Sequence, residues 1–184
     1  LEILTCSAMI RRKRNHLLIE ALSKINDIEI KWSHIGDGPE MKKLIAMADK
    51  FLSPKKNIEH QFLGRFSNHE LYNYYRNNPI DIFINLSTSE GIPMVIVEVM
   101  SFFIPVIATN VGGVSEIINN KNGVLIPSNP TIDEIINAIL KISNINNEEY
   151  STKQQKAFET WKKRFDAEKT YAKFAEDLYN LKKT

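Results

Sequence analysis

The sequence of 184 residues has the length of one domain, and its 43% apolar and 25% charged residues are typical of a globular protein rather than a disordered chain. With 24 basic and 22 acidic residues, the net charge of +2 does not by itself indicate nucleic-acid binding. The single cysteine, Cys6, excludes an internal disulfide, and no apolar run approaches the roughly 18 residues of a membrane span.

Strands and helices are predicted to alternate along the first 142 residues. Short β-branched or apolar runs predict strands, and apolar residues spaced by three and four predict helices. The predicted order is strand 2–6, helix 14–25, strand 28–35, helix 39–52, strand 58–63, helix 68–76, strand 81–86, helix 93–103, strand 105–109, helix 112–118, strand 123–126 and helix 131–142. This order predicts an α/β fold with a parallel sheet flanked by helices, in which ligands bind beyond the carboxyl ends of the strands.

The pattern changes after this alternating region. Residues 143–149 are polar and predict a connector, and residues 150–161 and 165–181 predict two further helices without another strand. The predicted organisation is therefore a domain over residues 1–142, followed by a connector and C-terminal helices over residues 143–184 that pack on it.

The segment from Ser89 to Glu116 contains the strongest signals of function. Glu90 follows a buried strand, and Pro93 begins a helix whose first N–H groups favour an anion such as phosphate. Glu98 lies about 7 Å further along the same helix, from a rise of 1.5 Å per residue. Carboxylates accept hydrogen bonds from hydroxyl groups. A ligand with a diphosphate in its middle and a polyol at each end, such as a nucleotide sugar, fits this pattern.

These residues carry a resemblance to a known family. Glu90 and Glu98 have the E-x7-E spacing of retaining glycosyltransferases of family 4, the glycosyl transferases group 1 domain, and EGIP…E…PVIATNVGGVSEII resembles the donor-binding core of that family. The resemblance extends to about residue 142 and includes LLIEAL, HIGDGPE, FLGRFSNHELYNYY and DIFINLSTSEG. It implies one half of a GT-B fold: a Rossmann-like, donor-binding C-terminal domain, with the N-terminal acceptor domain absent from this sequence.

The resemblance also implies roles for matching residues. Glu90 would contact hydroxyls of the transferred sugar as the catalytic carboxylate, Glu98 would hold the ribose, and Lys13 would neutralise the diphosphate. The loop of Arg65 and Phe66 would contact the base. The segment whose backbone N–H groups would hold the diphosphate consists of Gly91, Ile92, Pro93, Met94 and Val95. The family has no DxD-type metal motif, none is evident here, and we expect neither a metal nor a cofactor.

The sequence departs from the family pattern at two positions. The family often has an Arg where this chain has Ala8, so we expect one of Arg11, Arg12 and Arg14 to replace it. A Gly commonly stands at the position of Phe103, so either the end of that helix differs or Phe103 adopts an ordinary conformation.

The function that we predict is transfer of a sugar, with retention, from a nucleotide-diphosphate sugar to a glycan or lipid-linked acceptor in polysaccharide biosynthesis. The alternatives are a non-catalytic Rossmann-type nucleotide-binding regulatory module and a sugar-nucleotide epimerase of related architecture. We expect no nucleic-acid partner, a donor half that is inactive alone, and a cytoplasmic protein whose full-length form can associate peripherally with the inner face of the membrane.

Overall fold

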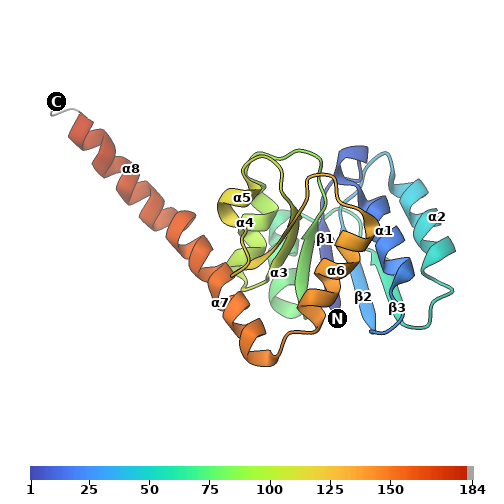
Figure 1. Cartoon of the computed structure of the whole chain (residues 1–184). Coiled ribbons are helices and arrows are strands. Elements are labelled where there is room, and N and C mark those ends of the chain that lie inside the picture. The colour runs from blue at the N-terminus through green and yellow to red at the C-terminus, as the bar shows by residue number, and fades with distance from the viewer. Residues whose placement is uncertain (182–184) are drawn as a thin grey trace.

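The computed structural model describes residues 1–181, except for the side chains of residues 169, 177, 180 and 181 (Figure 1). The strands are β1 (Glu2–Cys6), β2 (Ile30–Ile35), β3 (Ile58–Phe62), β4 (Ile82–Asn85), β5 (Val106–Thr109) and β6 (Gly123–Ile126). The helices are α1 (Asn15–Lys24), α2 (Met41–Phe51), α3 (Asn68–Asn77), α4 (Met94–Ser101), α5 (Val114–Ile117), α6 (Ile132–Ser143), α7 (Asn147–Arg164) and α8 (Ala167–Leu181), with a 3₁₀ turn at Arg11–Lys13 before α1.

All neighbouring strands of the sheet are parallel, in the order β3-β2-β1-β4-β5-β6. The chain builds outward from β1 in one direction through β2 and β3, and then in the other direction from β4. The strand order therefore reverses between β1 and β4. In sheets of this kind, ligands bind at such a reversal, outside the carboxyl ends of the strands.

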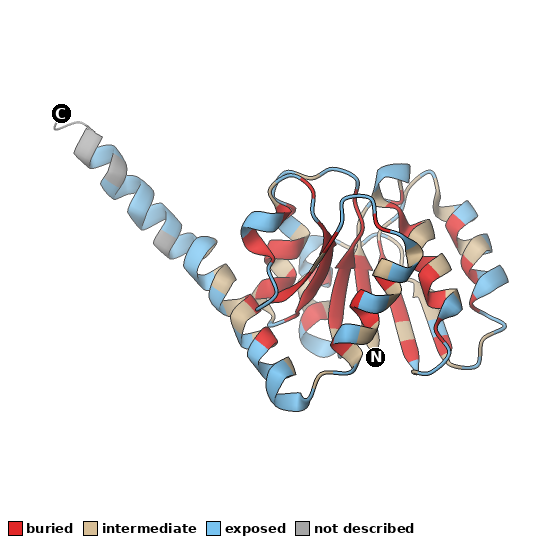
Figure 2. Ribbon diagram, viewed as in Figure 1, coloured by how far each residue is buried: buried red, intermediate tan, exposed pale blue. Residues whose placement is uncertain are grey.

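Each face of the sheet has its own apolar core because consecutive strand residues point to opposite faces. On β4, Ile82 and Ile84 belong to the core beneath α1, α2 and α6, whereas Phe83 belongs to the core beneath α3, α4 and α5. Both faces are thus covered, and Figure 2 shows β4 and β5 entirely buried, whereas the edge strand β3 is mostly half-buried. The α/β fold with a Rossmann-like parallel sheet, predicted from the sequence, is confirmed.

The predicted elements are all present, with ends that shift by a few residues. The connector is shorter than the polar segment 143–149 predicts, because α7 begins at Asn147. Asn146 caps this helix, and its side chain accepts a hydrogen bond from the N–H of Glu149 at 2.8 Å.

The two C-terminal helices differ in how they relate to the domain. Helix α7 packs against α4 and buries Lys153 and Ala157. Helix α8 projects away from the sheet in Figure 1, and its Tyr171 and Phe174 are 73% and 61% exposed. The predicted packing on the domain therefore describes α7 and not the exposed α8.

Phe103 corrects an expectation about the end of α4. It has φ 61°, the left-handed conformation that glycine adopts most easily, so it does not sit in an ordinary conformation. The N–H of Phe103 donates to the carbonyl of Met100, and the N–H of Ile104 donates to the carbonyl of Val99. These two bonds form the hydrogen-bond pattern of a Schellman motif. The helix end keeps the geometry of a glycine cap, and the Phe103 ring stacks on Phe158 with centroids 4.1 Å apart.

Candidate functional site

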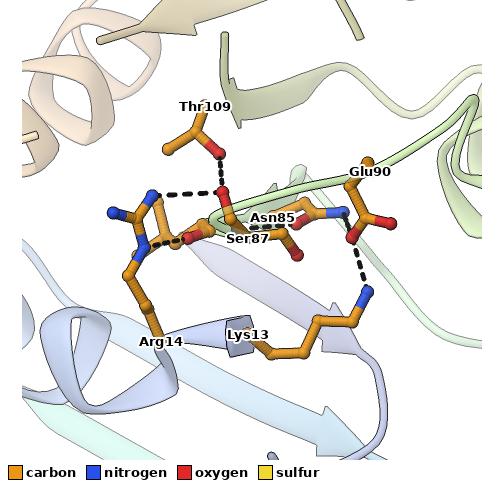
Figure 3. Close-up of polar contacts among 7 residues, drawn as sticks. Lys13, Arg14, Asn85, Ser87, Glu90 and Thr109 are labelled. Atoms are coloured by element: carbon orange, nitrogen blue, oxygen red, sulfur yellow. Dashed lines mark hydrogen bonds and ion pairs between the residues drawn. The ribbon is translucent and has the colours of Figure 1, made fainter. Parts of the chain in front are cut away.

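The candidate site lies where the strand order reverses, in the loops that follow β1 and β4. Lys13 comes from the first loop and Glu90 from the second, and their side chains form an ion pair with Nζ and Oε1 2.5 Å apart (Figure 3). The two side chains are only 14% and 10% exposed. The structure thus brings together a cation and a carboxylate that are far apart in the sequence, at the edge where a ligand is expected.

The surroundings of Glu90 keep its carboxyl group charged. Burial acts to raise the pKa of Glu90, but the hydrogen bonds from Lys13 and Asn85 and the charge of Lys13 outweigh it and hold the pKa below its usual range. Asn85, at the end of β4, also accepts a hydrogen bond from the N–H of Ser87 at 3.0 Å. At neutral pH the site therefore presents a carboxylate whose negative charge is matched by one lysine.

Two glycines explain why the loop of Glu90 can lie where it does. Gly112 has φ 51°, and a Cβ atom there would be 1.7 Å from the carbonyl oxygen of Glu90. The N–H of Gly113 donates to the carbonyl of Gly91 at 3.1 Å. The loop after β5 therefore packs backbone to backbone against the loop of Glu90, and a side chain at Gly112 would displace it.

The beginning of α4 follows the loop of Glu90 directly and carries free backbone N–H groups. Pro93 is the N-cap residue, and the N–H groups of Met94 and Val95 have no partner within the helix. The side chains of Ile92 and Met94 are 38% and 62% exposed, so the approach to the helix start is open. Such a helix start is suited to an anion.

Glu98 occupies a different environment from Glu90. It lies half-buried on α4, and burial raises its pKa above the ordinary value. Its charge also contributes to raising the pKa of the Cys6 thiol to about 12, although burial is the main cause. Cys6 is the last residue of β1, so the Glu98 carboxylate lies toward the same edge of the sheet as Lys13.

The loop predicted to contact a base follows β3 and joins the same edge. The carbonyl of Gly64 accepts a hydrogen bond from the N–H of Gly36 at 2.7 Å, which ties this loop to the one after β2. Arg65 is exposed, and Phe66 is half-buried with its ring 5.9 Å from that of Tyr74. Arg65 is thus free to reach a ligand, while Phe66 contributes to packing.

The basic cluster divides into two kinds of residue. Arg11 and Arg12 are exposed on the 3₁₀ turn, whereas Arg14 is buried and donates hydrogen bonds to backbone carbonyls of two other loops. Arg14 is therefore committed to the protein itself, which leaves Arg11 and Arg12 as the residues of this cluster that can compensate for Ala8. Sequence reasoning did not separate these residues, because nothing in RRKR distinguishes the side chain that turns inward.

The described part of the chain has neither a cluster of metal ligands nor a membrane-spanning helix. No three side chains of His, Cys, Asp or Glu in this part of the chain are grouped as a metal site would require. None of its helices combines the length and apolar character needed to cross a membrane.

The fold is that of a Rossmann-like α/β domain, and comparison with known proteins identifies its family. The family model of glycosyl transferases group 1 matches residues 1–161, and the chain belongs to this family. It is 37% identical, over 88% of its length, to the uncharacterized glycosyltransferase MJ1178 of Methanocaldococcus jannaschii. It is 33% identical, over 64% of its length, to the putative teichuronic acid biosynthesis glycosyltransferase TuaC of Bacillus subtilis, of which the match covers 27%.

Solved structures show the same architecture. Anabaena Alr3699/HepE, solved in complex with UDP and glucose, superimposes with a TM-score of 0.78 and 25% identity over 97% of this chain. The chain spans less than half the length of these proteins, since the matches cover 43% of MJ1178 and 48% of HepE. The fold corresponds to one half of a GT-B glycosyltransferase.

Proposed function

We propose that this chain is the donor-binding half of a retaining glycosyltransferase, which transfers a sugar from a nucleotide-diphosphate sugar to a glycan or lipid-linked acceptor in polysaccharide biosynthesis. The observation that carries the proposal is the pairing of Lys13 with Glu90 beside the start of α4, at the reversal of the strand order. Membership of the glycosyl transferases group 1 family favours a transferase over a regulatory module or an epimerase.

The chemistry follows from the charges of the site. Glu90 forms an ion pair with Lys13, which balances the charges of the two side chains. A diphosphate at the start of α4 would offer Lys13 a second and more highly charged partner, next to N–H groups that already favour an anion. When the bond between sugar and diphosphate breaks, negative charge grows on the diphosphate. Fixed positive groups at that position stabilise the transition state more than the substrate.

The two glutamates would then divide the recognition of the donor. Glu90, in the loop before α4, would accept hydrogen bonds from hydroxyls of the sugar, while Glu98 would accept them from the ribose. The exposed Arg65 and the loop that it shares with Phe66 would contact the base. We expect no metal in this arrangement, because Lys13 and the helix start would neutralise the phosphates.

Calorimetry with UDP, GDP and ADP tests the donor-binding half of the proposal. Glu98→Gln should weaken binding of the preferred diphosphate, because the ribose loses a charged acceptor that contributes about 1.5–3 kcal/mol. Glu90→Gln should leave that binding nearly unchanged, since the free diphosphate has no transferred sugar. Equal losses from both substitutions would contradict the division of roles. No binding of any of the three by the folded chain would contradict the donor site itself.

Sugar transfer is tested with the full-length protein. Radiolabelled UDP-, GDP- and ADP-sugars are supplied with a membrane or oligosaccharide extract as acceptor. Glu90→Gln should abolish most of the transfer while binding of the diphosphate persists. The 184-residue chain alone should bind the nucleotide weakly and transfer nothing, because the acceptor would bind to the other half. Rapid turnover by this chain alone would contradict the two-domain proposal.

A further inference from the structure

Arg14 has both an unusual backbone conformation and an unusual environment. Its φ of 52° is in the left-handed region, which costs free energy for a residue with a side chain. The residue is only 7% exposed, and burial lowers the pKa of its guanidinium, although an arginine remains protonated in proteins. A strained backbone and a buried charge at one residue require strong compensating contacts.

Those contacts reach two other loops. The Arg14 Nε donates to the carbonyl of Leu86 at 2.5 Å, and Nη2 donates to the carbonyls of Ser87 at 3.1 Å and Ser128 at 2.8 Å. A longer bond of 3.4 Å joins Nη1 to Asn129 Oδ1. All four acceptors are neutral. One guanidinium therefore ties the loop after β1 to the loops that follow β4 and β6, and Figure 3 shows its bonds to the carbonyls after β4.

The neighbours of Arg14 hold the same loop further along. The carbonyl of Arg12 accepts a hydrogen bond from the N–H of Thr88 at 2.9 Å, and Lys13 reaches Glu90. Three successive residues thus hold the segment from Leu86 to Glu90 at its beginning, its middle and its end. Because this segment is short, the position of its first carbonyl groups restricts where the carboxylate at its end can lie.

We propose that Arg14 is a positioning residue for Glu90: its guanidinium fixes the carbonyls of Leu86 and Ser87 and thereby keeps the Glu90 carboxylate within reach of Lys13. The planar fork of an arginine suits this task, because its donors can reach several carbonyls at once. The inference depends on the proposed function only for the chemical role of Glu90. The positioning itself is a property of the chain without ligand.

The direct test is the pKa of Glu90, measured by carboxyl-carbon NMR in the ligand-free chain. Arg14→Gly removes the guanidinium and also the backbone strain, because glycine adopts positive φ readily. We expect the pKa of Glu90 to rise toward its ordinary value as Lys13 and Asn85 lose their hold on it. Arg11→Gly is the matched control, since it removes an exposed positive charge from the same turn. Equal values in the two variants would overturn the proposal.

A second variant separates position from charge. Arg14→Lys retains a positive charge but cannot span the carbonyls of Leu86, Ser87 and Ser128. A raised pKa of Glu90 in both Arg14→Lys and Arg14→Gly supports positioning. A rise in Arg14→Gly alone would mean that Arg14 acts through its electric field, and the proposal would be wrong.

Thr109→Val tests the same carbonyl while Arg14 stays in place. The Thr109 hydroxyl donates to the carbonyl of Ser87 at 2.6 Å, so its loss also loosens the beginning of the loop. The pKa of Glu90 should again rise, and an unchanged value would count against positioning through this carbonyl. These pKa measurements need no nucleotide. An unchanged pKa of Glu90 would therefore contradict the positioning role of Arg14 without contradicting the proposed function. Absence of UDP binding would contradict the proposed function without affecting the pKa measurements.

Discussion

At the scale of single residues, the pKa values of the two glutamates of the site are shifted in opposite directions. The pKa of Glu90 is lowered although burial acts against it, because Lys13 donates to its carboxylate and contributes an opposite charge. The pKa of Glu98 is raised, because burial penalises its charged form. The E-x7-E spacing predicts both residues but not this difference, which depends on partners from other strands.

Glu98→Gln is expected to stabilise the ligand-free chain at neutral pH. A raised folded-state pKa means that ionisation of Glu98 costs the folded state more than the unfolded state, so this cost is present above the folded pKa and disappears below the ordinary value of 4.5. Thermal unfolding at pH 7 should show a higher midpoint for the variant, and the gain should vanish near pH 4. An unchanged or lower midpoint at pH 7 would contradict the burial cost.

His34 is expected to make the chain sensitive to acid. Its side chain is fully buried, and burial lowers its pKa to about 4, although a hydrogen bond with the Ser7 carbonyl acts against this. The Thr5 hydroxyl accepts a hydrogen bond from the Trp32 indole at 2.9 Å. Its own hydrogen can therefore be donated to Nδ1 of His34 at 2.8 Å, and Nε2 of His34 donates to the Ser7 carbonyl.

The neutral imidazole fits this hydrogen-bonded chain, and protonation would disrupt it. The unfolded state takes up the proton near pH 6.5 and the folded state only near pH 4. The free energy of unfolding should therefore fall by about 3 kcal/mol as the pH drops through this range. Urea unfolding at several pH values measures the slope, which should be shallower in His34→Gln. His69→Gln, at an exposed position on α3, is the control, and equal slopes in all three proteins would contradict the prediction.

At the scale of elements, the sequence predicts most of the fold because apolar periodicity reports local structure directly. The helix predicted over residues 68–76, for instance, is present as α3, and the Ser-x-x-Glu spacing of Ser67 and Glu70 forms a capping box at its start. Apolar periodicity does not predict the left-handed conformation of Phe103, nor the stacking of its ring on Phe158, which lies in α7 far along the sequence. The inward turn of Arg14 likewise depends on carbonyls of loops that follow other strands.

Substitution of Phe103 should separate backbone strain from ring stacking. Phe103→Gly gains about 1 kcal/mol by relieving positive φ and loses about 0.5–1.5 kcal/mol of stacking, so the free energy of unfolding should change by less than about 1 kcal/mol. Phe103→Val loses the ring, and its β-branched side chain is strained at positive φ. Chemical denaturation should show Phe103→Val as clearly the less stable variant. Equal stability of the two would mean that the left-handed conformation carries little strain.

At the scale of the whole molecule, the domain has two apolar cores, one on each face of the sheet, and helix α8 lies outside both. The cores on both sides of the sheet include residues from α1 through α7, and α7 adds the buried Ala157 and a bond of 2.6 Å from Lys153 to the Asn120 carbonyl. Helix α8 adds an amphipathic sequence whose Tyr171, Phe174 and Leu178 remain exposed.

Removal of α8 should therefore leave the stability of the domain almost unchanged. A chain that ends at Asp166 should unfold within about 0.5 kcal/mol of the complete one, as for surface changes in general. A chain that ends at Asn146 also loses α7 and exposes the side of α4 that α7 covers, so its thermal midpoint should fall by many degrees. A large loss of stability in the chain that ends at Asp166 would show that α8 supports the domain.

The ion pair between Lys13 and Glu90 also determines when the site can form during folding. The two residues are separated by 77 positions, and they meet only through the pairing of β1 with β4, which joins the two halves of the sheet. Contacts of such long range form late, because a large loop must close before they contribute. Neither the part of the sheet formed by β1, β2 and β3 nor the part formed by β4, β5 and β6 can assemble the site alone. A nucleotide that binds there would recognise only chains whose two halves have docked, and would protect them selectively from local opening of the β1–β4 seam.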